Sequence, residues 1–214
     1  MIKNRLLKTE NAIMREALLY KIVSLNEIIK PGFNFGSVTK KDNLKEYFAG
    51  LILSKIYSLV VSMNNSIFAN DVFISIYLYR YIYELSIKVF YIFSGSPEDQ
   101  ILSRLNEFFD NKKWNLAEIK DAIDINLSSP ELFRNHKKSY ESICKFVHPN
   151  IDSLNLHLNR TDDQQFEFIC PNINLTIWYI VEIMRLFMNF KILNLNTNID
   201  QKKLRFLQSF EVHP

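Results

Sequence analysis

The sequence predicts an all-α protein, a single-domain helical bundle of about six to eight helices. Only four glycines and six prolines occur in 214 residues, whereas all-β proteins need many Gly- and Pro-rich turns. Apolar residues make up 48% of the chain and recur at the i, i+3, i+4 spacing of helices, in sufficient number for one core. No internal repeat, low-complexity tract or linker divides the chain, so we expect residues 1–214 to form one domain.

Residues that start or stop helices set the expected boundaries. Asp42 or Asn43 can cap the second helix, "NNS" at 64–66 is expected to break or bend it, and "SSPEL" at 128–132 is the clearest helix start. The alternating stretch "QQFEFIC" predicts a short extended segment near 163–170. The expected helices cover residues 3–30, 44–63, 68–93, 97–110, 115–125, 128–147, 174–194 and 201–209.

Two apolar runs are long enough to be considered as membrane spans, but both contain charged residues. Lys55 interrupts the run 47–63, and three charged residues interrupt the run 77–93. Charges near the centre of a bilayer are costly, so both runs predict helices buried in a soluble bundle. The first residues are amphipathic and lack the apolar region of a secretory signal. We therefore expect a cytoplasmic protein that does not interact with membranes.

Several chemistries are disfavoured by composition and motif. The formal net charge of +3 does not by itself indicate a nucleic-acid-binding protein. Cys144 and Cys170 form no CxxC or Cys/His zinc pattern, so a reduced cytosolic pair is expected. The sequence contains no GxxxxGK[ST], GxGxxG, GxSxG or HExxH motif. We expect neither a cofactor nor a bound metal.

A column of charges crosses the apolar stretch "YLYRYIYELSIKVFYIF". Arg80, Glu84 and Lys88 are spaced i, i+4, i+8 and therefore share one stripe of a helix. One interpretation is a solvated stripe with weak ion pairs. The other follows from the apolar character of the rest of this helix, because charges on a buried helix must be paired or must face a cleft. On that interpretation Arg80 and Glu84 line an internal polar site.

A second candidate feature is the stretch "KSYESICKFVHPN". Tyr140, Cys144 and His148 are again spaced i, i+4, i+8, and His148 falls at a helix C-terminus because Pro149 follows it. His148 can act there as a structural cap for free carbonyl groups. Alternatively it is a general acid or base, since its unperturbed pKa lies near neutrality. Cys144 is better explained as a small buried residue than as a nucleophile.

The basic stretch "RNHKK" is a candidate for phosphate binding. Arg134, Lys137 and Lys138 share one broad face of the expected helix, and such a face can contact phosphate groups. A solvated helix surface explains the same run of charges.

These two stretches together carry a resemblance. The helix with "RYIYE" (80–84), followed by "YESICKFVHP" (140–149), resembles poorly characterised bacterial helical proteins. In those proteins an Arg-x-x-x-Glu helix precedes a Tyr-x-x-Leu/Ile-Ser/Cys-x-x-x-His-Pro helix end. That group is similar in layout to the HEPN superfamily of helical ribonucleases, common in toxin–antitoxin and anti-phage systems. HEPN nucleases typically carry an Arg followed four to six residues later by a His on one helix. This chain lacks that spacing, because Arg134 and His136 are two residues apart and no Arg lies four to six residues before His148.

The resemblance, which spans about residues 45–195, implies a site assembled from two helices. Its catalytic candidates are Arg80, Glu84, Tyr140 and His148, and Arg134, Lys137 and Lys138 are the candidates for substrate binding. It implies a metal-independent ribonuclease of a toxin or defence system, with RNA and a defence-operon protein as partners and a homodimer as the assembly. Two alternatives stay open: a non-catalytic interaction module (antitoxin, sensor or scaffold) and a small-molecule-binding bundle.

Overall fold

The computed structural model shows an all-α bundle, which confirms the predicted fold class. It describes residues 2–29, 43–95, 97–125, 127–131, 133, 140, 162–192 and 207–208, and the side chains from residue 10 onward. No strand occurs within these ranges. The helices are α1 (Ile2–Ile29), α2 (Leu44–Ala69), α3 (Val72–Phe93), α4 (Glu98–Phe109), α5 (Leu116–Asp121) and α8 (Asp162–Asn189).

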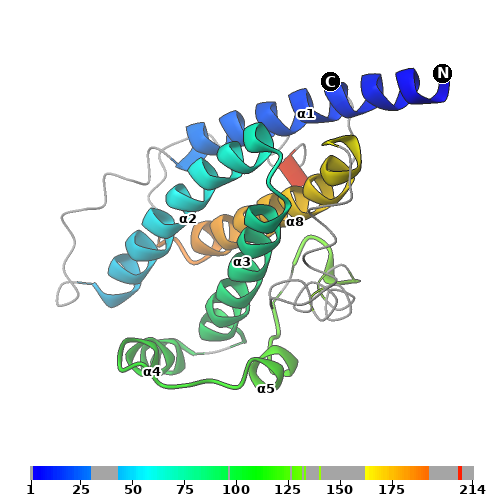
Figure 1. The fold of residues 1–214 in the computed structure, drawn as a ribbon. Helices are drawn as coiled ribbons and strands as arrows, with labels where there is room; N and C mark the ends of the chain where they lie inside the picture. Colours follow the sequence, from blue (N-terminus) through cyan, green and yellow to red (C-terminus); the bar gives the residue numbers. More distant parts are fainter. Residues whose placement is uncertain are drawn as a thin grey trace.

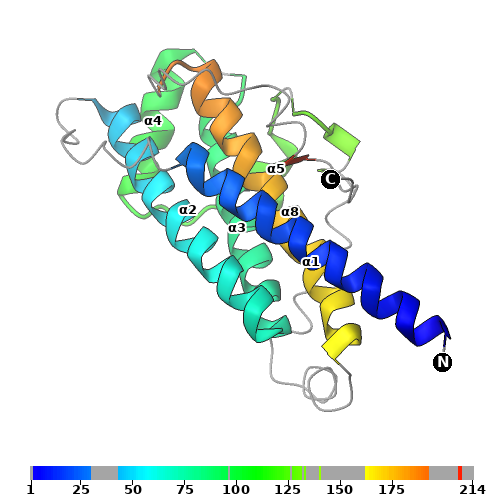
Figure 2. The ribbon, with the colours of Figure 1, turned by 90° about the horizontal axis from the view of Figure 1, so that it is seen from above.

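Helix α3 is the centre of the bundle (Figure 1). It packs against α2, α4, α5 and α8, and its contact with α8 is the most extensive in the described part of the chain. Helix α1 lies across α2 and α8, and its N-terminal end extends beyond them (Figure 2). The shorter helices α4 and α5 lie near the C-terminal end of α3. This arrangement leaves one long side of α3 only partly covered by the described helices.

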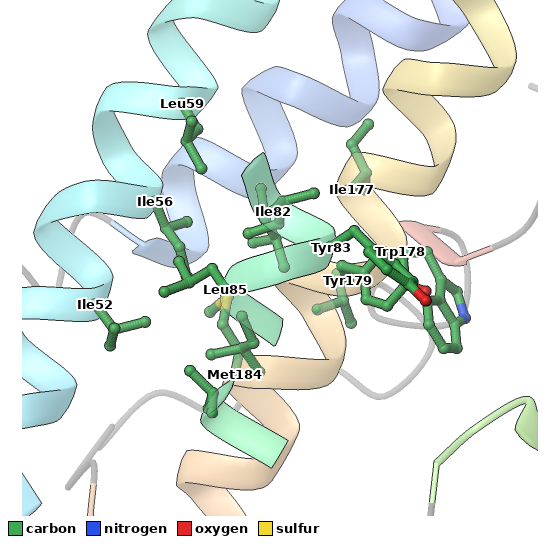
Figure 3. Packing of buried hydrophobic residues seen from close by; sticks show 14 of the residues in the cluster. Ile52, Ile56, Leu59, Ile82, Tyr83, Leu85, Ile177, Trp178, Tyr179 and Met184 are labelled. Atoms are coloured by element: carbon green, nitrogen blue, oxygen red, sulfur yellow. The ribbon is translucent and has the colours of Figure 1, made fainter. Parts of the chain in front are cut away.

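The core forms where α2, α3 and α8 meet. Apolar side chains from the three helices converge there (Figure 3). Helix α8 is buried on nearly all sides between Ile173 and Phe187, and Trp178 and Tyr179 are both almost inaccessible to solvent. Complete burial of a large apolar side chain contributes roughly 1.5–3 kcal/mol. The labelled core residues are Ile52, Ile56, Leu59, Ile82, Tyr83, Leu85, Ile177, Trp178, Tyr179 and Met184.

The predicted break at 64–66 is wrong, because α2 continues through these residues to Ala69. Ser66 and Ile67 are buried at the helical spacing that the preceding core residues establish. The helix ends at Asn70, which adopts a left-handed conformation with φ of 53°, and Asp71 then caps α3 by accepting the N–H of Ile74. Asn is one of the few non-glycine residues that adopt this conformation readily.

The expected extended segment near 163–170 is also wrong, because α8 begins at Asp162 and includes these residues. Phe166, Ile169 and Ile173 are buried at i, i+3, i+7, so a helical period, and not a period of two, decides the local structure. Pro171 lies inside this helix on the exposed side. Its missing N–H leaves the carbonyl group of Glu167 without its usual partner, and the next turns carry side-chain bonds that accommodate this interruption. Asn172 Nδ2 donates to Phe168 O, Asn174 Nδ2 to Cys170 O and Thr176 Oγ1 to Asn172 O.

Among the described helices, α2 is long and apolar enough to pass a membrane-span criterion of length and composition. Within its most apolar 18-residue window, 44% is buried inside the bundle. Core helices of soluble proteins satisfy the same criterion, so this feature is weak evidence for a span. Helix α3, whose apolar run is interrupted by charges, does not satisfy it.

Candidate functional site

Among the described residues, the charged column on α3 contains one ion pair. Arg80 Nε donates to Glu84 Oε1 at 2.9 Å, and each side chain is 31% exposed. These exposures place the pair between the two interpretations of the sequence: it is neither fully solvated nor enclosed in the core. In the described part of the chain no ion pair extends from Glu84 to Lys88. The pair therefore forms a half-buried polar group at the edge of the bundle.

Tyr140 joins this pair from a distant part of the sequence. Its hydroxyl group donates to Glu84 Oε1 at 2.6 Å. Its ring stacks on Tyr83, with centroids 4.5 Å apart and an interplanar angle of 27°. One carboxylate oxygen thus accepts from both Arg80 and Tyr140. Three of the four predicted catalytic residues meet in one cluster, which we call the Glu84 cluster (Arg80, Glu84 and Tyr140).

Helix α5 adds a cation that sequence reasoning missed. Lys120 Nζ lies 5.6 Å from the ring centroid of Tyr83 and 5.2 Å from that of Phe133. Such cation–π contacts contribute about 0.5–1 kcal/mol at exposed sites. Lys120 occupies an unremarkable position in the amphipathic stretch "AEIKDA", so no local signal links it to α3. It gives the neighbourhood of the Glu84 cluster a second positive charge.

The other edge of the exposed side of α3 borders a groove, which we call the α2/α3 groove. Its volume is about 320 Å³. Tyr77 and Tyr81 stack with ring centroids 6.4 Å apart, and Lys55 Nζ lies 5.1 Å from the Tyr81 ring centroid. Burial, and then the neighbouring Tyr77 phenol, raise the pKa of Tyr81. The lining residues are Lys55, Ser58, Leu59, Ser62, Asn65, Ile74, Tyr77, Leu78 and Tyr81.

The remaining predicted site residues lie outside the described residues. These are His148 and the phosphate-binding candidates Arg134, Lys137 and Lys138, together with Cys144. Their roles stay predictions.

A buried carboxylate on α8 organises a second polar cluster. Glu182 is 2% exposed. Its Oε2 accepts the backbone N–H of Ser128 at 3.3 Å, and its Oε1 accepts Arg185 Nη1 at 3.2 Å, the Ser128 hydroxyl and Gln208 Nε2. A carboxylate with this many donors is satisfied within the fold. We therefore assign Glu182 a structural role, joining α8 to residues 128 and 208.

A third polar cluster lies between α1 and α8. The ammonium group of the buried Lys21 donates to Asn174 Oδ1 at 2.9 Å, and Asn174 Nδ2 lies 3.5 Å from Cys170 Sγ. Burial lowers the pKa of Lys21. Burial also raises the pKa of Cys170 to about 11, although the nearby Lys21 charge and the Asn174 hydrogen bond oppose this shift. A thiol with so high a pKa is a poor nucleophile, so this cluster does not provide an active cysteine.

The described residues contain no group of three His, Cys, Asp or Glu side chains placed to hold a metal ion. The Glu84 cluster instead combines a guanidinium group, a carboxylate and a phenol, which are suited to binding an anion and to exchanging hydrogen bonds. Comparisons of the chain with protein-family models, with curated proteins and with solved structures found no match.

Proposed function

We propose that this chain is a HEPN-like helical ribonuclease, an effector of a bacterial toxin or anti-phage system, with the Glu84 cluster at its RNA-binding site. The observation that supports this proposal most strongly is the hydrogen bond from Tyr140 to Glu84. It joins the two stretches on which the resemblance depends, and it does so on the partly exposed side of α3.

Arg80 is the phosphate-binding group of the proposed site. Its contact with Glu84 engages Nε and holds the guanidinium group in a fixed orientation. Guanidinium groups match phosphate oxygens in a two-pronged geometry. Charge that develops on the phosphate oxygens during cleavage is stabilised by a donor held in position beforehand. Glu84 and Tyr140 are positioning residues, because they act through Arg80 and not on the substrate.

The proposed cleavage uses the ribose 2′-hydroxyl group of RNA. Its oxygen attacks the adjacent phosphorus and forms a new P–O bond, while the bond from phosphorus to the 5′-oxygen of the next nucleotide breaks. One proton leaves the 2′-hydroxyl group and one is gained by the 5′-oxygen, so the products are a cyclic phosphate and a 5′-hydroxyl group. His148 is proposed to carry a proton in this exchange, since imidazole titrates near neutral pH.

The proposal extends to the cellular setting. A cytoplasmic homodimer would place two Glu84 clusters in one cleft, as the HEPN resemblance implies. Arg134, Lys137 and Lys138 would supply further phosphate contacts, and a protein from the same defence operon would control the activity. These elements rest on the resemblance and await measurement.

The decisive experiment is RNA degradation by the purified full-length chain and its Arg80→Ala and His148→Ala variants. We expect wild type to cleave single-stranded RNA, and each variant to lose activity roughly 100-fold, as when a transition-state donor is removed. Arg185→Ala is a matched control, because Arg185 is 34% exposed and also pairs with a glutamate on its own helix. Circular dichroism checks that each variant is folded.

The alternatives give different results in the same assay. An interaction module or a small-molecule-binding bundle would leave RNA intact, and wild type would equal both variants. Equal background degradation in all samples would refute the ribonuclease proposal. Loss of helical structure in Arg80→Ala would assign Arg80 a structural role.

A further inference from the structure

The α2/α3 groove lies on the same partly exposed side of α3 as the Glu84 cluster. Tyr81 follows Arg80 directly, and Tyr77 is one helical turn earlier, a rise of about 5.4 Å. Tyr77 and Arg80 are spaced i, i+3 and are therefore neighbours on the surface of α3, and Tyr81 stacks with Tyr77. In RNA the base is attached to the phosphate through a single ribose, so a phosphate-binding group and a base-binding surface must be neighbours on the protein.

We propose that the α2/α3 groove is a base-binding subsite for single-stranded RNA, with a base stacked on Tyr77 while a neighbouring phosphate contacts Arg80. This inference rests on the proposed function, because it names the part of the substrate that the same site binds. It adds residues from α2 that the sequence did not indicate.

The aromatic wall of the groove suits a nucleobase. Tyr77 is 58% exposed, which is unusual for a large aromatic side chain in the middle of a long core helix. The rings of Tyr77 and Tyr81 are inclined by only 30°, so they form a stepped aromatic surface. Proteins that bind single strands stack bases on such side chains, and each stacked base contributes about 1–3 kcal/mol.

The opposite wall, on α2, supplies polar groups to the edge of a base. The Ser58 hydroxyl group donates to Ser54 O at 3.3 Å and the Ser62 hydroxyl group to Ser58 O at 3.0 Å. Each hydroxyl proton is thus used inside the helix, and the hydroxyl oxygen faces the groove as an acceptor. Asn65 adds an amide group with both donors and an acceptor. Base edges present amino, imino and carbonyl groups, which pair with such a set.

Lys55 makes one end of the groove positive. Its ammonium group lies against the Tyr81 ring, and no ion pair involves it within the described residues. Lys55 belongs to α2 and Arg80 to α3. Together they supply two positive charges for the phosphates of a single strand, as in a positively charged single-strand channel.

The test uses fluorescence anisotropy with a labelled single-stranded RNA oligonucleotide and the full-length chain carrying His148→Ala, so that the RNA is not consumed. We expect Tyr77→Ala to weaken binding roughly 5- to 100-fold, the range that base–aromatic stacking spans. Tyr77→Trp should retain the affinity. Tyr20→Ala is the matched control, because Tyr20 is a 62% exposed tyrosine on α1, and it should leave the affinity unchanged.

An abasic oligonucleotide separates base stacking from backbone binding. With Tyr77 present, removal of bases should weaken binding by a similar factor, and in Tyr77→Ala it should change little further. Lys55→Ala should reduce the salt dependence of log K by about one phosphate contact. Lys113→Ala, an exposed lysine between α4 and α5, controls for net charge.

The outcomes distinguish this inference from the ribonuclease proposal, which is measured by cleavage in parallel. Affinity in Tyr77→Ala that stays within twofold of Tyr20→Ala overturns the base subsite, whether or not wild type cleaves RNA. Binding that depends on Tyr77 without any cleavage supports the subsite and refutes the ribonuclease. The absence of RNA binding by the chain overturns the subsite.

Discussion

The Tyr140 hydroxyl group donates a 2.6 Å hydrogen bond to Glu84 Oε1, although the two residues are 56 positions apart. Arg80 Nε donates to the same oxygen at 2.9 Å. One carboxylate oxygen on the central helix therefore accepts from both a guanidinium group and the Tyr140 hydroxyl group. The Glu84 cluster has a tertiary partner that no local pattern on α3 specifies.

Removing the Tyr140 hydroxyl group should lower stability without disturbing the fold. We expect Tyr140→Phe to reduce the free energy of unfolding by about 1 kcal/mol, the size of one net hydrogen bond at a partly exposed site. Urea denaturation followed by circular dichroism measures this change. Tyr77→Phe is the control, because Tyr77 is mostly exposed, and an equal effect in both variants would contradict the assignment.

Glu182 should contribute more to stability than any exposed carboxylate on the same helix. Glu182→Ala removes, at a position that is 2% exposed, the carboxylate that accepts from Ser128 and Arg185, so we expect a loss of about 1–3 kcal/mol. Glu167→Ala, at an exposed position of α8, should change stability by less than about 0.5 kcal/mol. Chemical denaturation of the two variants provides the comparison, and similar midpoints would refute the structural role of Glu182.

Cys170 should make the protein less stable at alkaline pH. Its pKa is about 11 in the folded chain against an ordinary value of about 9, so the unfolded chain loses its thiol proton first. Below pH 9 the thiol is protonated in both the folded and the unfolded chain, so it does not reduce the free energy of unfolding. As the pH rises from 9 through 11, the thiol ionises first in the unfolded chain, and the free energy of unfolding falls. The lowered pKa of Lys21 acts in the opposite direction, because the cost of burying its charge fades as the pH rises.

Urea midpoints at pH 8 and pH 10.5 isolate the effect of Cys170. Cys170→Ala should show a smaller alkaline loss than wild type. Each variant is compared with itself at the two pH values, so the stability lost to the small cavity that alanine leaves cancels. Identical pH dependence in Cys170→Ala and wild type would contradict the prediction.

Replacing the proline inside α8 should stabilise the protein. Pro171 lies on the exposed side of the helix and cannot donate to the carbonyl group of Glu167. We expect Pro171→Ala to raise the free energy of unfolding by about 1–3 kcal/mol. Thermal denaturation measures the shift. A decrease would show that the surrounding helices require the interrupted geometry.

Much of the architecture follows from periodicity and helix-capping residues. Asn43 caps α2 by accepting from the N–H groups of Lys45 and Glu46, as one of the two expected caps. The start of α8 was missed because "QQFEFIC" satisfies a period of two as well as a helical period over its short length. The longer set Phe166, Ile169 and Ile173 has a helical period. Pro171 obscures this period in the sequence, because proline is unfavourable inside a helix.

The candidate site was predictable only in part. The i, i+4 spacing placed Arg80 and Glu84 on one stripe, and the apolar character of the rest of the helix raised a polar site as an alternative to a solvated stripe. Lys55 and Lys120, from other helices, lie against the neighbouring rings of Tyr81 and Tyr83, and such proximity depends on how helices cross. Glu182 shows the same difficulty, because its partners lie far away in the sequence.

The packing of α3 against α8 has a consequence for synthesis of the chain. Helix α8 is the last of the six described helices to leave the ribosome, and α3 emerges well before it. During that interval the apolar surface of α3 lacks the helix with which it makes its most extensive contact, and Phe93, for example, lacks its partner ring Phe187. A nascent chain in this state exposes apolar surface, so it is prone to aggregation and binds chaperones. We therefore expect the rate at which the segment from α3 to α8 is translated to affect the yield of soluble protein.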